Sequence, residues 1–154
     1  MKNRFIVAAA LCFACPSAWA LSESEPNGAT FSANGPFSIP DTITGNCQND
    51  GEALQDYYSF SSASGQKWRF VATVVNASGF FPLDLRIGVA NSGNSFLANV
   101  DNFGNNVSES LNFTAPSAGT YYFVVDEATA RPNSVASYSV AVSPQAAVSD
   151  WNLY

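Results

Sequence analysis

The sequence has no histidine and few basic residues. Its 154 residues include 6 Lys and Arg against 12 Asp and Glu, so the formal net charge is −6 at pH 7. Without an imidazole group, the chain cannot build a Ser-His-Asp triad, and most kinds of catalytic zinc site are excluded. Nucleic-acid binding needs clustered Lys and Arg, so the acidic balance argues against it. We therefore expect a protein that is not an enzyme and does not bind nucleic acid.

A long hydrophobic run is also missing. The apolar run near the start, Phe5–Phe13, has nine residues, whereas a membrane-spanning helix needs about 20. The stretch follows two basic residues and precedes Ala18-Trp19-Ala20, whose small residues stand at −3 and −1 of a cleavage site. We predict that residues 1–20 form a secretory signal peptide. The remaining chain is then secreted or periplasmic, with no membrane span.

Cysteine is scarce for an exported chain. Two of the three cysteines lie within the predicted signal peptide, which leaves Cys47 alone. A single cysteine cannot form a disulfide within the chain, so the core itself must supply the stability. Because no histidine is present to activate the thiol, we interpret Cys47 as a small, partly buried side chain.

Short segments in which apolar residues alternate with polar ones recur along the rest of the chain. In residues 67–75, for example, Trp68, Phe70 and Ala72 share one face, and Gly, Ser, Asn and Pro separate one segment from the next. Such segments predict an all-β protein with an antiparallel β-sandwich of about eight to nine strands, jelly-roll-like, over residues 21–144. The expected strands are 37–43, 56–60, 67–75, 84–90, 96–100, 109–113, 120–126 and 137–143. The expected core aromatics are Tyr58, Phe60, Trp68, Phe70, Phe113, Tyr121, Phe123 and Tyr138.

Residues 145–154 end in the apolar sequence Trp151-Asn152-Leu153-Tyr154. This tail is either a final edge strand or an exposed apolar segment. A packed edge is favoured, because exposed aromatic residues promote aggregation.

The order of several short motifs resembles that of the bacterial pre-peptidase C-terminal domain. The motifs are Glu23-Ser24-Glu25-Pro26-Asn27, Asp56-Tyr57-Tyr58-Ser59-Phe60, Leu83–Ile87, Ala118–Val125 and Tyr138-Ser139-Val140. The family includes the collagen-binding domains of clostridial collagenases, and the resemblance extends from Glu23 to Val142. It implies a jelly-roll sandwich in secreted proteins, usually appended to a protease and often acting as a targeting or binding module. No protease precedes the domain in this sequence, so a free-standing binding role is expected.

Oxygen-bearing side chains alternate in the first of these motifs. Glu23, Glu25 and Asn27 point the same way if the segment is extended, and Ca²⁺ takes six to eight oxygen ligands. In the collagenase relatives, the matching segment and the acids before a Tyr/Phe strand bind calcium. The resemblance therefore implies a Ca²⁺ site at Glu23, Glu25, Asn27 and Asp56, with Asp50 close enough in the loop to contribute. The alternative is that these acids are simply solvated.

Two tyrosines are expected to face away from the core. If Tyr58 and Tyr121 point inward, the two-residue period turns Tyr57 and Tyr122 outward. Outward aromatic rings suit stacking on sugars or packing against an extended protein, but loops could equally cover them. We expect a non-catalytic module that binds an extracellular protein or polysaccharide. The alternative is an accessory or inhibitory partner of a secreted protease, docking through edge strands or the C-terminal tail.

Overall fold

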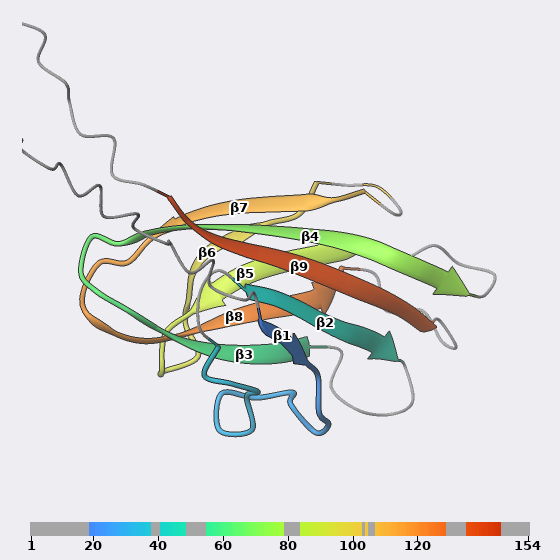
Figure 1. Cartoon of the computed structure of the whole chain (residues 1–154), viewed down its shortest axis with the longest axis horizontal. Helices are drawn as coiled ribbons and strands as arrows, with labels where there is room; N and C mark the ends of the chain where they lie inside the picture. Colours follow the sequence, from blue (N-terminus) through green and yellow to red (C-terminus); the bar gives the residue numbers. More distant parts are fainter. Residues whose placement is uncertain are drawn as a thin grey trace, which may run out of the picture.

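The computed structural model describes residues 19–37, 41–48, 55–78, 84–102, 104, 107–128 and 135–145. These residues contain β-strands and no helix. Figure 1 shows the strands arranged as two facing layers. The strands are β1 (Trp19–Ser22), β2 (Asp41–Gln48), β3 (Gln55–Ser62), β4 (Lys67–Ser78), β5 (Leu85–Ala90), β6 (Phe96–Val100), β7 (Glu109–Thr114), β8 (Gly119–Glu127) and β9 (Val135–Gln145).

Two sheets make up the sandwich. The five-stranded sheet has the order β1-β2-β9-β4-β7, and the four-stranded sheet has the order β3-β8-β5-β6. All pairings are antiparallel except that of β1 with β2, which is parallel. The predicted all-β sandwich is therefore confirmed.

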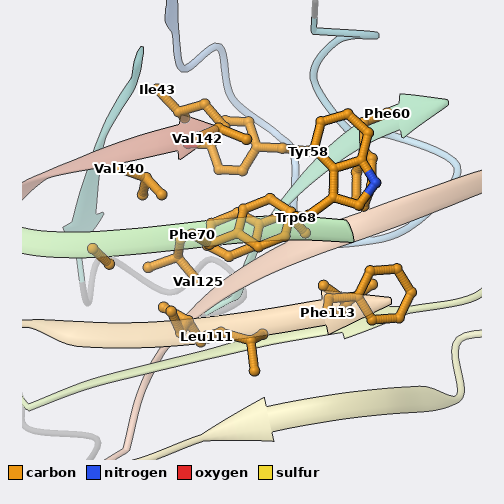
Figure 2. Packing of buried hydrophobic residues seen from close by; sticks show 14 of the residues in the cluster. Ile43, Tyr58, Phe60, Trp68, Phe70, Leu111, Phe113, Val125, Val140 and Val142 are labelled. Carbon is orange, nitrogen blue, oxygen red and sulfur yellow. The ribbon is translucent and has the colours of Figure 1, made fainter. Parts of the chain in front are cut away.

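Aromatic side chains fill the space between the sheets (Figure 2). Phe70 on β4 stacks on Phe123 of β8 with ring centroids 4.5 Å apart and so joins the two layers. Phe60 on β3 packs edge-on against Trp68 and Phe70, at 5.3 and 5.6 Å. Pairs of this kind contribute about 0.5–1.5 kcal/mol beyond the burial of their area. All eight aromatic residues expected in the core are buried.

The first strand differs from the sequence-based prediction. β1 begins at Trp19 and pairs Trp19 with Asp41 and Ala20 with Thr42, although both residues belong to the predicted signal peptide. Cleavage after Ala20 would leave Leu21 and Ser22 to hold this pairing, together with the hydrogen bond from the Glu23 amide to the Thr44 carbonyl at 2.9 Å.

Several other predictions fall on residues that the structure does not describe. These include most of the signal peptide, residues 1–18, and the tail, residues 146–154. Cys47 lies on β2, but nothing can be said of its side chain. The described residues include no helix long and apolar enough to cross a membrane.

Candidate functional site

Three carboxylates meet between the end of β1 and the start of β3. Glu23 follows β1, Glu25 stands two residues later, and Asp56 is the second residue of β3. One carboxylate oxygen from each residue lies within 4.8 Å of the others. The structure thus brings together three of the five residues predicted to bind calcium.

Backbone groups hold two of these side chains in place. The Glu23 carboxylate accepts a hydrogen bond from the amide of Asn46 on β2. Glu25 accepts one from the amide of Asn27 at 2.9 Å. Asp56 lies in the paired part of β3, opposite Val125 of β8. The cluster therefore spans the two sheets, because β2 belongs to one and β3 to the other.

A pair of buried tyrosines positions Asp56. The Tyr138 hydroxyl on β9 donates to Oδ2 of Asp56 at 2.5 Å, and the hydroxyl oxygens of Tyr138 and Tyr58 lie 2.6 Å apart. Sequence reasoning assigned both tyrosines to the core and missed this role. The sequence offered no signal for it, because Tyr138 is 82 positions from Asp56 along the chain.

A glycine makes room for this arrangement. Gly45 on β2 is paired with Tyr138 of β9. A Cβ atom at Gly45 would stand 2.5 Å from Cζ of Tyr138 and 2.6 Å from Oε2 of Glu23, whereas distances below about 3.0 Å are essentially never seen. Only glycine lets the Tyr138 ring and the Glu23 carboxylate approach β2 this closely.

The local environment disfavours negative charge on the cluster. Burial, together with a hydrogen bond to Glu25 and the charges of Asp56 and Glu25, raises the pKa of Glu23 to about 9. Burial, followed by the charges of Glu25 and Asp126, raises the pKa of Asp56 to about 7 despite the opposing hydrogen bond from Tyr138. The site thus concentrates acidic groups that a positive ion would stabilise in the ionised form.

Unpartnered oxygen atoms test whether the site fits a metal ion. Oε1 of Glu23 and both polar side-chain atoms of Asn27 are buried and have no hydrogen-bond partner among the residues that the structure describes. Asn27 is fully buried. Its backbone carbonyl accepts a hydrogen bond from the backbone amide of Tyr57 at 3.1 Å, which places Asn27 next to Asp56. Buried polar atoms normally find partners, and carboxylate and amide oxygens are the ligands that Ca²⁺ prefers. The residues fit a calcium ion.

The cluster is open to an ion from outside. A hollow of about 340 Å³ beside it is lined by Glu23, Gly45, Asn46 and Tyr138, among others. Asp50, the fifth predicted ligand, lies outside the described residues.

The two tyrosines predicted to face outward do lie on the outer side of the four-stranded sheet. Tyr57 packs there against Val124 and Ala90, with Ala33 alongside, and is only 2% exposed. Its hydroxyl oxygen lies 3.0 Å from both Gln55 Oε1 and Asn94 Oδ1. Tyr122 is half-buried in the same cluster.

A second hollow, of about 220 Å³, opens further along this outer face. It is lined by Arg86, Ile87, Phe96, Asn99 and Asp126. Arg86 forms an ion pair with Asp126, and this ion pair raises the pKa of the guanidinium. Phe96 is 48% exposed, and its ring fills the space over Gly88. Sequence reasoning missed this hollow, because nothing in the alternation of residues marks Phe96 as outward-facing.

One protein family is similar to the middle of the chain. Residues 55–127 match the model of the bacterial pre-peptidase C-terminal domain. These residues, just under half of the chain, are thus similar to that family. Domains of this family are non-catalytic. A search of curated proteins found none that matches the chain.

A solved structure shares the fold of this chain. The pre-peptidase C-terminal domain of a collagenase from Bacillus anthracis aligns with a TM-score of 0.52 and 17% identity, over 82% of this chain and 96% of that one. The periplasmic inhibitor of g-type lysozyme from Aeromonas hydrophila aligns with a TM-score of 0.43 and 17% identity, over 82% and 96% of the two chains. At 17% identity, the similarity to the collagenase domain shows a shared fold alone.

Proposed function

We propose that this domain is a secreted, non-catalytic binding module, stabilised by calcium, that recognises an extracellular protein or polysaccharide. The observation that carries the binding role is the hollow on the outer face of the four-stranded sheet. Exposed apolar side chains on β6 and a fixed ion pair adjoin it, which is the usual make-up of a binding site.

The ligand face combines aromatic and charged groups in fixed positions. Tyr122 of β8, Ala90 of β5 and Phe96 of β6 form one row across the sheet, because Ala90 pairs with both of the others. Arg86 and Asp126 pair four residues further along these strands, about 13 Å from that row. Aromatic rings on a rigid sheet provide contact area at a low cost in conformational entropy. Tyr57 of β3 is buried on the same outer side of the sheet and packs in one cluster with Tyr122.

Pull-down from solution with immobilised polymers tests the ligand face. Collagen, chitin and cell wall are suitable polymers, and each is incubated with the wild-type domain, Phe96→Ser and Tyr122→Ala. We expect one polymer to retain the wild type and both variants to lose retention. Val75→Ser is the matched control, because Val75 is 55% exposed and lies on β4 of the other sheet. Equal retention of all variants on every polymer would refute the assignment.

Calcium is the second part of the proposal. The unpartnered oxygens of Glu23 and Asn27 support it, as does the meeting of Glu23, Glu25 and Asp56 within 4.8 Å. An ion that binds only the folded state at 100 times its dissociation constant stabilises it by about 2.7 kcal/mol.

Thermal unfolding with calcium or chelator tests the ion. We expect millimolar Ca²⁺ to raise the Tm by several degrees, and Glu23→Gln with Glu25→Gln to abolish the increase. Asp84→Asn removes one acid charge elsewhere and should keep the full response. An unchanged Tm in the wild type at millimolar Ca²⁺ would remove calcium from the proposal without affecting the ligand face.

A second candidate function is an accessory or inhibitory partner of a secreted protease. One observation favours it: β6 is an edge strand of the four-stranded sheet, with Phe96 and Leu97 48% and 42% exposed. Edge strands of this kind can pair with an extended segment of another protein. A protease recovered with the domain from culture supernatant, and lost with Leu97→Asp, would favour this role over polymer binding.

A further inference from the structure

The outer face of the five-stranded sheet is covered by small polar side chains. Thr44 of β2, Ser139 of β9 and Thr73 of β4 form one row across it, since Ser139 pairs with both of the others. Ser110, Asn112 and Thr114 of β7 face the same way and are exposed. Hydroxyl and amide groups therefore cover a broad surface formed by four strands.

Charge is segregated around this face. Among the described residues, the only acidic side chain that adjoins it is Glu23, which lines a hollow with Thr44 and Ser137 at the end away from the start of β4. Asp41 of β2 and Glu109 of β7 belong to the same sheet but are buried, 7% and 0% exposed, on its inner side. The others lie near β1, on the four-stranded sheet or beside it: Glu23, Glu25, Asp56, Asp84, Asp101, Asp126 and Glu127.

Two cations occupy the end of the face where β4 begins. Lys67 and Arg69 are exposed and share the outer side of β4, about 7 Å apart along the strand. Within the described part of the chain, neither side chain forms a salt bridge or a hydrogen bond. Lys67 pairs with Thr114 and Gln145 on the neighbouring strands, and a hydrogen bond of 2.7 Å from Gln145 to Asn112 crosses beside it.

We infer that this face binds an acidic polysaccharide, one whose sugars carry carboxylates. The two unpaired cations would hold two carboxylates of one polymer chain, and charge-assisted hydrogen bonds are the strongest contacts available to an exposed lysine or arginine. The surrounding hydroxyl and amide groups would donate to and accept from the sugar hydroxyls. This site lies on the opposite sheet from the ligand face and is independent of the proposed function.

The composition of the face favours a polysaccharide over other anions. No aromatic side chain is among its residues with described burial, and the aliphatic ones are small, such as Val71 and the 55% exposed Val75, whereas large aromatic anchors dominate protein–protein interfaces. A membrane contributes only about 1 kcal/mol per basic residue, and two such residues on a protein of net charge −6 give little attraction. The charge segregation leaves this face as the one described surface where a polyanion meets cations without facing acids.

Binding to polygalacturonate, a polymer of uronic acids, tests the inference. Wild-type protein is titrated with soluble polygalacturonate, and separately with neutral dextran, at low salt and in a chelator. The chelator prevents calcium from bridging the polymer to acidic groups of the protein, and tryptophan fluorescence checks that the chain remains folded. We expect binding to polygalacturonate alone, weakened by 0.5 M NaCl because the attraction is screened.

Two double variants locate the binding surface. Lys67→Ser with Arg69→Ser should weaken binding on the order of tenfold, because each exposed ion pair contributes a few-fold, and should leave the Tm unchanged. Ser92→Asp with Ser95→Asp lowers the net charge by the same two units in the turn between β5 and β6, and should bind as the wild type does. Phospholipid vesicles containing phosphatidylserine serve as the competing anionic surface.

The inference is overturned by any of four results. These are no binding to polygalacturonate at low salt, equal binding to dextran, equal loss in both double variants, or binding to the vesicles in place of the polymer. Loss confined to the Lys67 and Arg69 variant supports it. Because Phe96 and Tyr122 lie on the other sheet, failure here leaves the proposed ligand face untouched.

Discussion

Replacing Gly45 by alanine tests how the carboxylate cluster is built. The new methyl group would meet the ring of Tyr138 at 2.5 Å and the Glu23 carboxylate at 2.6 Å. Neither neighbour can move freely, because Tyr138 is buried and bonded to Asp56, and Glu23 accepts a hydrogen bond from β2. Relieving the overlap must therefore displace backbone or break one of these bonds.

The cost of the substitution can be estimated from its packing. Extra methyl groups in a well-packed core usually destabilise a protein by about 1–3 kcal/mol. For a domain of this size, that corresponds to a fall in Tm of roughly 3–15 °C. Because the overlap involves Glu23 and Tyr138, we also expect the calcium-dependent increase in Tm to shrink or disappear.

Differential scanning calorimetry, with calcium and with chelator, measures both effects. Gly119→Ala is the matched control, because Gly119 is exposed and a Cβ atom there would meet nothing within 4 Å. If Gly45→Ala keeps the wild-type Tm and calcium response, then Gly45 does not constrain the cluster and the reasoning is wrong.

Three further predictions concern charge and packing. Without calcium, the Tm should fall between pH 5 and pH 8.5, and calcium should reduce this fall. The reason is that the folded-state pKa values of Glu23 and Asp56, about 9 and about 7, exceed the ordinary values of 4.5 and 3.8 for these side chains. The folded state therefore loses its proton-linked stability as pH rises, and a flat profile in chelator would contradict the shifts. In urea unfolding at pH 8, Asn102→Ala should cost about 1–3 kcal/mol, because its side-chain amide donates to the fully buried Glu109 at 2.8 Å; a cost below 0.5 kcal/mol would mean that the carboxylate finds another donor. Phe70→Ala should cost about 3–5 kcal/mol in the same assay, and a smaller loss would show that the stacked pair with Phe123 is not central to the core.

The strands could be predicted from the sequence because their residues alternate. The expected segment 96–100 coincides with β6, and 67–75 falls within β4. β1 was not predicted, since a strand of four residues shows too little alternation and its parallel partner, β2, begins 22 positions later. Long-range pairing of this kind leaves no local pattern.

The carboxylate cluster was only partly accessible to sequence reasoning. Glu23 and Glu25 stand two residues apart, and the family resemblance linked them to Asp56. The roles of Tyr138 and Gly45 depend on the register between β2 and β9, which places residues 93 positions apart opposite each other. No pattern within either segment specifies that register.

Tyr57 shows what alternation cannot predict. It does face away from the core, as the two-residue period requires. The outer face is nevertheless covered there, because the amide of Asn34 donates to the Tyr57 carbonyl at 2.9 Å and Ala33 packs on the ring. Which side of a strand a residue faces follows from the sequence, but whether another segment covers that side does not.

The segment that follows β1, residues 23–37, connects the proposed calcium site to the proposed ligand face. It begins at the carboxylate cluster, crosses from the five-stranded to the four-stranded sheet and pairs with β3 at Asn34 and Tyr58. An ion held by Glu23, Glu25 and Asp56 would join β1, this segment and β3 at one point. The same segment buries Tyr57, which packs beside Tyr122 on the ligand face. Calcium would therefore stabilise more than the fold: by fixing the segment over Tyr57, it would hold the aromatic side of the ligand face in one conformation and lower the entropic cost of binding.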